Sequence, residues 1–151
     1  MNIYLRNIDP NDYVWIWECR NDEHTRMNSI HTDSISLEDH MSWMKSSSKN
    51  PNRKIMIGCY LEDNVGVIRF DIINEDTALI SINLSPGHRG KGYSVPILKS
   101  LEDIIKQEYR KVKILQAVVK QGNIASIKAF IRANYVKVKE DATIITLEKY
   151  I

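Results

Sequence analysis

Residues 84–94 hold the residue types best suited to bind a charged ligand, in the order LSPGHRGKGYS. Three glycines in this stretch allow the backbone to turn tightly and to approach a ligand closely. A predicted helix begins near Tyr93, and the free N–H groups and positive dipole end of a helix favour an anion. Arg89 and Lys91 add positive charge. The stretch predicts a loop that binds a pyrophosphate, although glycines alone also fit an ordinary strand-to-helix turn.

Two common phosphate-binding patterns are excluded for this loop. It lacks G-x-x-x-x-G-K-[ST], the pattern that cradles nucleoside triphosphates, and it lacks the dinucleotide pattern G-x-G-x-x-G. No acidic residue follows at the spacing that dinucleotide binding needs. Neither class of nucleotide site is therefore indicated here.

Two segments together resemble the GNAT superfamily of N-acetyltransferases. Residues 89–94 (RGKGYS) resemble its acetyl-CoA pyrophosphate motif, [QR]-x-x-G-x-[GA]. Residues 123–135 (NIASIKAFIRANY) resemble its second motif, N-x-x-[AS]-x-x-[LF]-[YF]-x-x-x-G-F. The two segments stand in the family's order, with a predicted helix and strand between them. Ser94 and Asn134 are small departures, since Asn tolerates the left-handed conformation that ends a helix.

The resemblance implies an enzyme that uses acetyl-CoA as co-substrate, without a metal, and whose acceptor amine attacks the thioester directly. The family supplies a backbone N–H to the developing oxyanion, and the matching donor here is the N–H of Leu84. Leu84 also fits a simple core position, and Asn123 also fits an N-cap. The residues that the resemblance assigns to the coenzyme are Ile82, Leu84, Arg89, Gly90, Lys91, Gly92, Tyr93, Ser94, Asn123, Ser126 and Phe130.

The groups that would move protons are left open by the sequence. Phe130 stands where many members of the family carry a Tyr that reprotonates the CoA thiolate, so Tyr93 or water is the candidate acid. The acceptor amine must be neutral to attack, which calls for a base. The candidate bases, each of which also fits a solvated or structural role, are His40, Asp71, His31 and Glu75, with His40 and Asp71 selected.

The first third of the chain carries a different set of residues. Its segments W-x-x-R-N-D (residues 17–22) and H-x-x-W (residues 40–43) resemble the subgroup that acetylates an amino group on nucleotide-linked sugars, as in the pseudaminic acid pathway. Residues 65–71 are similar to that subgroup's third strand. Arginine binds phosphate oxygens in pairs, and tryptophan offers a flat surface to a uracil ring or a sugar. The residues assigned to the acceptor are Trp17, Arg20, Asn21, Arg26, Trp43 and Arg69.

Other interpretations of these segments stay open. The two tryptophans also fit core anchors, and Arg20 also fits a surface charge. A peptide or ribosomal-protein N-terminal acetyltransferase is a rival enzyme. The absence of a hydroxyl at Phe130 also fits a binding protein that senses acyl-CoA without turnover.

Composition restricts the class of protein. The 151 residues include 21 Lys and Arg against 19 Asp and Glu, a net charge of +2, which gives no basic field for nucleic acid. No apolar run reaches the ~18 residues of a membrane span, and the N-terminus lacks a signal-peptide pattern. Cys19 and Cys59 stand apart from any metal motif and fit core thiols in a reducing compartment. We expect a cytoplasmic protein with a small-molecule amine as its partner, and a possible homodimer.

The elements that must position these residues follow from periodicity and turn signals. They form a single domain, residues 1–151, of the α/β (α+β) class with the GNAT fold. We expect a mixed central sheet of about seven strands with four helices, in the order β α α β β β α β α β β. The strands are 3–7, 53–61, 65–73, 78–84, 112–119, 135–139 and 143–149, and the helices are 10–20, 37–47, 93–109 and 124–133. Residues 21–35 are expected to be irregular.

Overall fold

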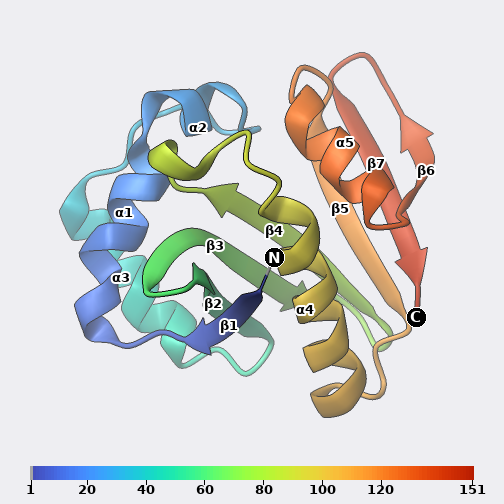
Figure 1. Ribbon diagram of the computed structural model, residues 1–151, viewed down its shortest axis with the longest axis horizontal. Coiled ribbons are helices and arrows are strands. Elements are labelled where there is room, and N and C mark those ends of the chain that lie inside the picture. The colour runs from blue at the N-terminus through green and yellow to red at the C-terminus, as the bar shows by residue number, and fades with distance from the viewer. Residues whose placement is uncertain (1) are drawn as a thin grey trace.

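The computed structural model describes residues 2–151 and places them in one seven-stranded sheet with helices on both faces (Figure 1). The strand order in the sheet is β1-β2-β3-β4-β5-β7-β6. The elements are β1 (Ile3–Asn7), a 3-10 helix (Pro10–Asp12), α1 (Tyr13–Asn21), α2 (Glu23–Met27), α3 (Leu37–Ser48), β2 (Arg53–Tyr60), β3 (Asp63–Ile72), β4 (Thr77–Leu84), a second 3-10 helix (Pro86–His88), α4 (Ser94–Glu108), β5 (Ile114–Lys120), α5 (Ile124–Arg132), β6 (Val136–Glu140) and β7 (Ile144–Tyr150).

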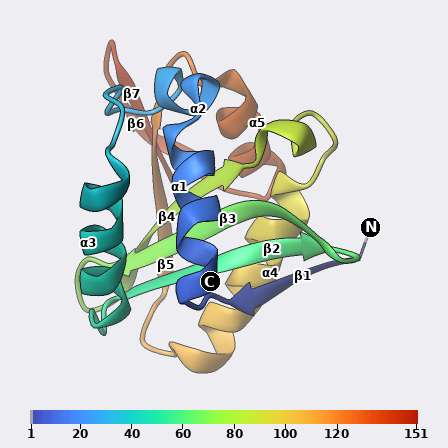
Figure 2. The same cartoon turned by 90° about the vertical axis from the view of Figure 1, so that its left-hand side faces the viewer.

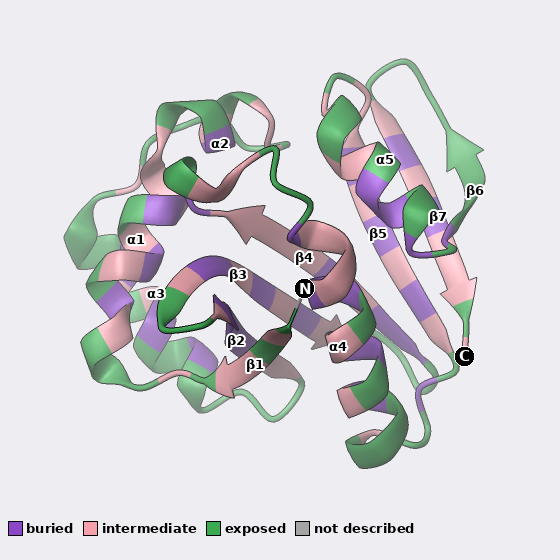
Figure 3. Ribbon diagram, viewed as in Figure 1, coloured by how far each residue is buried: buried purple, intermediate pink, exposed green. Residues whose placement is uncertain are grey.

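The sheet separates two hydrophobic cores because successive side chains of a strand point to opposite faces. On β2, Met56 joins the larger core with α4 and α5, while Ile55 and Ile57 join the smaller core with α1 and α3. Figure 2 shows α1 and α3 together on one side of the strands. Burial alternates along β5, whereas β6, the outermost strand, is exposed along its length (Figure 3).

The parallel pair β4 and β5 separates part way along its length. Its ladder runs only from Thr77 and Ile114 to Leu79 and Gln116, although both strands continue well beyond that point. The N–H of Ser85 donates to β3, so by alternation the backbone groups of the even residues at the end of β4 face β5. Ile80, Ile82 and Leu84 therefore present backbone groups to an open edge inside the sheet.

The predicted fold class is confirmed, with corrections in the first third of the chain. Residues 2–151 contain five α-helices rather than four, because residues 21–35 contain α2. That helix has only five residues and a single buried one, Thr25, so it gives no periodic apolar signal. The predicted helix 10–20 is divided into the first 3-10 helix and α1. Strand β3 starts at Asp63 because the preceding turn is tight, with a positive φ of 55° at Leu61.

Candidate active site

The loop between β4 and α4 has the backbone conformation that its glycines allow. Gly90 and Gly92 have φ angles of 72° and 80°, in the left-handed region that side chains with a Cβ disfavour. A Cβ built at either position would meet no atom within 4 Å. The glycines are therefore required by the backbone conformation and not by lack of space.

The amides of this loop are open. Among residues 2–151, no backbone or side-chain acceptor receives a hydrogen bond from the N–H groups of residues 89–95. Tyr93, the N-cap of α4, provides no side-chain cap, and the first helical bond is donated by Ile97 to Tyr93. Seven consecutive donors at the positive end of a 15-residue helix form a site for an anion of several oxygens, such as a diphosphate.

The side chains of the loop divide into three groups. Lys91 is exposed and makes no hydrogen bond or ion pair within residues 2–151. The ring of Tyr93 is buried, with its centroid 5.6 Å from that of Tyr60 and 5.9 Å from that of His88. Arg89 turns away from the loop amides to α2, where its Nη2 donates to Asp22 Oδ2 at 2.5 Å and to Thr25 Oγ1 at 2.9 Å. Sequence reasoning included Asp22 in the segment 17–22 but missed its contact with Arg89, because the two residues are 67 positions apart.

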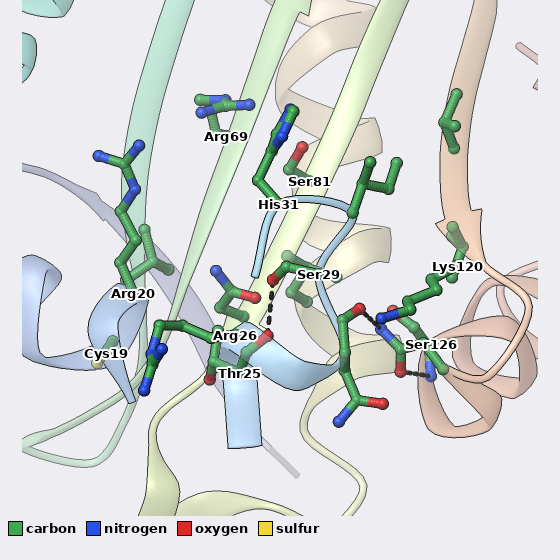
Figure 4. A pocket seen from close by; sticks show the side chains of 18 of the residues that line it. Cys19, Arg20, Thr25, Arg26, Ser29, His31, Arg69, Ser81, Lys120 and Ser126 are labelled. Atoms are coloured by element: carbon green, nitrogen blue, oxygen red, sulfur yellow. Dashed lines mark hydrogen bonds between the residues drawn. The ribbon is translucent and has the colours of Figure 1, made fainter. Parts of the chain in front are cut away.

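A cavity of about 420 Å³ lies beside the open edge of β4 and reaches the N-terminal helices (Figure 4). It brings together parts of the two predicted sets. Of the coenzyme set, Ile82, Asn123, Ser126 and Phe130 line it, and of the acceptor set, Arg20, Arg26, Trp43 and Arg69 do so.

Three residues that the resemblance assigns to the coenzyme have clear local roles. Asn123 caps α5 by accepting from the N–H of Ser126 at 3.3 Å, and its Nδ2 donates to the carbonyl of Asn28 at 3.2 Å. Phe130 is buried against Tyr135, with ring centroids 4.9 Å apart. Leu84 lies outside the lining, where its side chain packs against the larger core.

Trp17 and Asn21 lie outside the lining and brace a residue that belongs to it. The indole Nε1 of Trp17 donates to the carbonyl of Ile35 at 2.7 Å. The side-chain oxygen of Asn21 accepts from the N–H of Ile35 at 2.9 Å. Ile35 lines the cavity. The structure therefore places these two residues behind the wall.

The two selected base candidates are also engaged outside the cavity lining. His40 is fully buried; its Nε2 lies 2.8 Å from the carbonyl of Tyr13 and its Nδ1 lies 3.3 Å from Arg20 Nη1. Nε2–H must donate to the carbonyl, so Nδ1 accepts from the guanidinium. Burial, together with the charge of Arg20, lowers the pKa of His40 despite its bond to Tyr13. His40 thus orients an arginine and has no free nitrogen for a substrate proton.

Asp71 is held by two arginines. Its Oδ1 lies 2.5 Å from Arg53 Nε and its Oδ2 lies 3.1 Å from Arg69 Nε. The second contact is poorly aligned, since Arg69 Nε is buried without a hydrogen-bond acceptor among residues 2–151. Glu75 lies in the exposed turn after β3, whereas His31 lines the cavity.

Three guanidinium groups surround the ring of Trp43. The carbon centres of Arg20, Arg53 and Arg69 lie 4.5, 5.1 and 5.4 Å from the ring centroid. Burial and the charges of the other two arginines lower the pKa of Arg20, and burial lowers that of Arg69. Among the described residues, Asp71 is the only acidic side chain that forms an ion pair with any of these three arginines. We call Trp43 and its three arginines the arginine cluster.

Arg53 was missed by the sequence analysis. It starts β2 and pairs with Asp71 across the hairpin to β3. The signal that would have found it is the register of that hairpin. The predicted strands 53–61 and 65–73 leave the turn at residues 62–64, whereas the observed turn lies between Tyr60 and Asp63. The register also shifts at Gly58/Cys59, so the predicted pairing places a different residue opposite Asp71.

Two further properties concern the whole described chain. Within residues 2–151, no helix combines the length and the apolar character that crossing a membrane requires. Within the same range, no group of three or more His, Cys, Asp or Glu side chains is placed to hold a metal ion. Cys19 and Cys59 are free and buried, and burial raises the pKa of the Cys19 thiol to about 12.

Comparison with known proteins agrees with this geometry. A family model described as the acetyltransferase (GNAT) family matches residues 8–135. No curated protein matches the chain. Many solved structures do, and one is an aminoglycoside acetyltransferase, AAC(6')-Ib, with coenzyme A: TM-score 0.86 and 14% identity over 99% of this chain and 95% of that one.

Two other solved structures share the fold. A spermidine N-acetyltransferase from Vibrio cholerae, with CoA and spermine, has a TM-score of 0.88 and 13% identity over 98% of this chain and 95% of that one. The Campylobacter jejuni N-acetyltransferase PseH, with acetyl coenzyme A, has a TM-score of 0.73 and 20% identity over 99% of both chains. Identities this low establish a common fold and leave the acceptor to be argued from the cavity.

Proposed function

The chain belongs to the acetyltransferase (GNAT) family, and we propose that it transfers the acetyl group of acetyl-CoA to the amino group of a nucleotide-linked sugar. The observation that carries this proposal is the charge of the cavity. Its lining includes four cationic side chains (Arg20, Arg26, Arg69 and Lys120) and one carboxylate, Asp33. Such a lining favours an acceptor that brings negative charge with its amine.

The positive charge of the cavity lining also favours an acceptor different from the ligands bound to two of the relatives that share the fold. Spermine and aminoglycosides carry several protonated amines at neutral pH, and the structures of those relatives contain such ligands. A cavity with an excess of arginine repels a polycation, because like charges at close range raise the free energy of binding. A diphosphate presents oxygens that guanidinium groups bind in pairs.

The arginine cluster supports a diphosphate in particular. Arg69 has a buried Nε with no acceptor among residues 2–151, and Arg20 has no carboxylate partner in that range. An anion bound in the cavity would contact Arg20 and Arg69, which both line it. All three guanidinium groups lie within cation–π distance of the ring of Trp43. The similarity of residues 17–22 and 40–43 to nucleotide-sugar acetyltransferases agrees with this site.

The residues present also fit the coenzyme. The open amides of residues 89–95 suit its diphosphate, and the unpaired backbone of Ile82 and Leu84 suits the amides of its pantetheine arm. When bound, acetyl-CoA supplies an acyl carbon activated as a thioester. We propose that the N–H of Leu84 donates to the oxygen of that carbonyl, which gains negative charge during transfer.

The proton of the acceptor amine requires a separate acceptor. His40 and Asp71 are committed to arginines, so we propose His31, which lines the cavity, as the base in their place. The thiolate of CoA would take its proton from water, since Phe130 has no hydroxyl. Neither assignment changes the proposal that the arginine cluster binds the diphosphate of the nucleotide-linked sugar.

The test is a direct comparison of acceptors. Purified protein is mixed with acetyl-CoA and with a UDP-linked 4-amino sugar, spermidine, kanamycin or an N-terminal peptide, and free thiol is followed. We expect kcat/KM for the UDP-linked sugar to exceed that for each other amine by about 100-fold or more, the effect of one or two charge-assisted contacts. Faster turnover of any other amine would overturn the acceptor proposal. Tight CoA binding without turnover of any amine would favour the sensing protein instead.

A further inference from the structure

Arg89 joins the coenzyme loop to a helix from the other side of the cavity. Asp22 Oδ2 receives Nη2 of Arg89 at 2.5 Å and the N–H of Thr25 at 3.2 Å, so one carboxylate oxygen both caps α2 and binds the loop. Arg89 Nη2 also donates to Thr25 Oγ1 at 2.9 Å. Partial burial raises the pKa of Asp22, but the bonds from Arg89 and Thr25 outweigh it and hold the pKa below its usual range. The carboxylate of Asp22 therefore stays ionised at neutral pH.

Helix α2 depends on such contacts. It has five residues, far fewer than an isolated helix needs, and only Thr25 is buried. Apart from Arg89, two side chains from the coenzyme side hold the segment. Lys120 Nζ donates to the carbonyl of Met27 at 3.0 Å, and Asn123 Nδ2 donates to that of Asn28 at 3.2 Å.

The same segment forms part of the cavity wall. Thr25, Arg26 and the residues that follow α2 line the cavity, and Figure 4 shows Thr25, Arg26, Ser29 and His31 around it. Figure 1 shows α2 beside the loop that follows β4. Three contacts thus connect one short wall of the cavity with the loop between β4 and α4 (Arg89), with β5 (Lys120) and with the N-cap of α5 (Asn123).

We infer that Asp22 is a positioning residue that fixes α2 to the coenzyme loop through Arg89, so that binding of the coenzyme orders a wall of the acceptor cavity. The amides of the loop, rather than the guanidinium of Arg89, then bind the diphosphate. This inference requires coenzyme binding at the loop and is independent of which amine is acetylated. It differs from the role that the family resemblance gives Arg89, which is direct contact with the diphosphate.

The two roles predict different effects of the same variants. The experiment is hydrogen exchange of residues 22–29, read by mass spectrometry with and without saturating CoA, on Arg89→Gln, Asp22→Asn and the double variant. We expect each single variant to exchange about tenfold faster than wild type in this segment, as expected when a local anchor is lost. The double variant should be no faster than either single one, because both remove the same contact.

The response to CoA separates positioning from a merely local stabilisation. In wild type, CoA should slow exchange of residues 22–29 by a further threefold or more, and in Arg89→Gln it should have no such effect. Arg89→Lys keeps a cation near Asp22 and should restore part of the response. Lys91→Gln is the matched control, since it removes a cation of the same loop that has no partner within residues 2–151. Its ligand-free exchange in this segment should equal that of wild type.

Two results would overturn the inference. One is a Kd for CoA raised more than tenfold by Arg89→Gln but not by Asp22→Asn, with exchange of residues 22–29 unchanged. The other is faster exchange of this segment when CoA binds to wild type, because Arg89 would then leave Asp22 for the diphosphate. Unchanged exchange of the buried face of α4 verifies that each variant is folded. A failure of the UDP-linked sugar as acceptor would leave these measurements unaffected.

Discussion

The proposed coenzyme site and the proposed acceptor site of this protein are built from different kinds of hydrogen-bond donor. On the coenzyme side, the donors are main-chain N–H groups of residues 89–95 and the unpaired edge of β4. On the acceptor side, the donors are guanidinium groups from α1, β2 and β3 arranged around a tryptophan of α3. A main-chain site depends on backbone conformation and tolerates changes of side chain. A side-chain site depends on each charge and on the partners that hold it.

The first prediction tests the main-chain site and carries the largest expected effect. Gly92→Val places a β-branched residue at a φ of 80°, which costs about 2–3 kcal/mol in backbone strain. We expect the loop to move out of this conformation and the Kd for CoA, measured by calorimetry, to rise about 100-fold.

The control for this prediction is Gly87→Val. Gly87 lies in the same loop, has no positive φ, and would also meet no atom within 4 Å with a Cβ. It should change the Kd for CoA less than threefold. If both variants raised the Kd for CoA equally, CoA binding would depend on the size of the side chain in the loop rather than on the backbone conformation.

This difference also explains which parts of the molecule could be predicted from the sequence. The loop between β4 and α4 could be predicted because glycines, a strand end and a helix start are local signals within one segment, 84–94. The mixed sheet and the order of its strands and helices along the chain were also predicted, since hydrophobic periodicity and short turns indicate them. The five-residue helix α2 was missed because it has no apolar stripe of its own.

The acceptor side was predicted only by residue type. Arg20, Trp43 and Arg69 were selected and do meet around the cavity, while Trp17 and Asn21 brace Ile35 from behind. Whether a residue lines the cavity or lies behind it depends on the direction in which its side chain leaves the helix or strand and on the register of the hairpins. Neighbouring residues in the sequence do not specify either property. The placement of His40 and Asp71 beside arginines depends on the same long-range geometry.

The second prediction tests the side-chain site. Arg69→Gln removes the guanidinium whose Nε has no acceptor, while Asp71 retains Arg53. The loss of one charge-assisted contact, about 2 kcal/mol, should raise the Kd for UDP about 30-fold in calorimetry. The Kd for CoA should stay within threefold of wild type, because the loop amides are unchanged.

Lys54→Gln is the matched control for Arg69→Gln. Both substitutions remove one positive charge from the protein. Lys54 neither lines the cavity nor makes a side-chain hydrogen bond within residues 2–151. Its Kd for UDP should be that of wild type. If both variants weaken UDP alike, general attraction between protein and ligand explains the binding and the arginine cluster does not.

The last prediction concerns His40, which supports the arginine cluster from behind, and its effect is the smallest. Because the pKa of His40 is lowered in the folded protein, the unfolded state binds more protons below the ordinary value of about 6.5. The free energy of unfolding should therefore decrease as the pH falls below that value, until the folded pKa is reached. At higher pH, His40 is neutral in both the folded and the unfolded state. It should then make no contribution to the change of the free energy of unfolding with pH.

His40→Gln should remove this part of the pH dependence and cost about 1 kcal/mol of stability at pH 8, the net value of a buried hydrogen bond. Urea unfolding at several pH values between about 5.5 and 8 measures both effects, in a range above the carboxylate titrations. His24→Gln is the control, because His24 is exposed and its ring makes no hydrogen bond within residues 2–151. That variant should keep the wild-type slope. A slope that survives in His40→Gln would mean that another group titrates on folding, and His40 would then hold Arg20 without responding to pH.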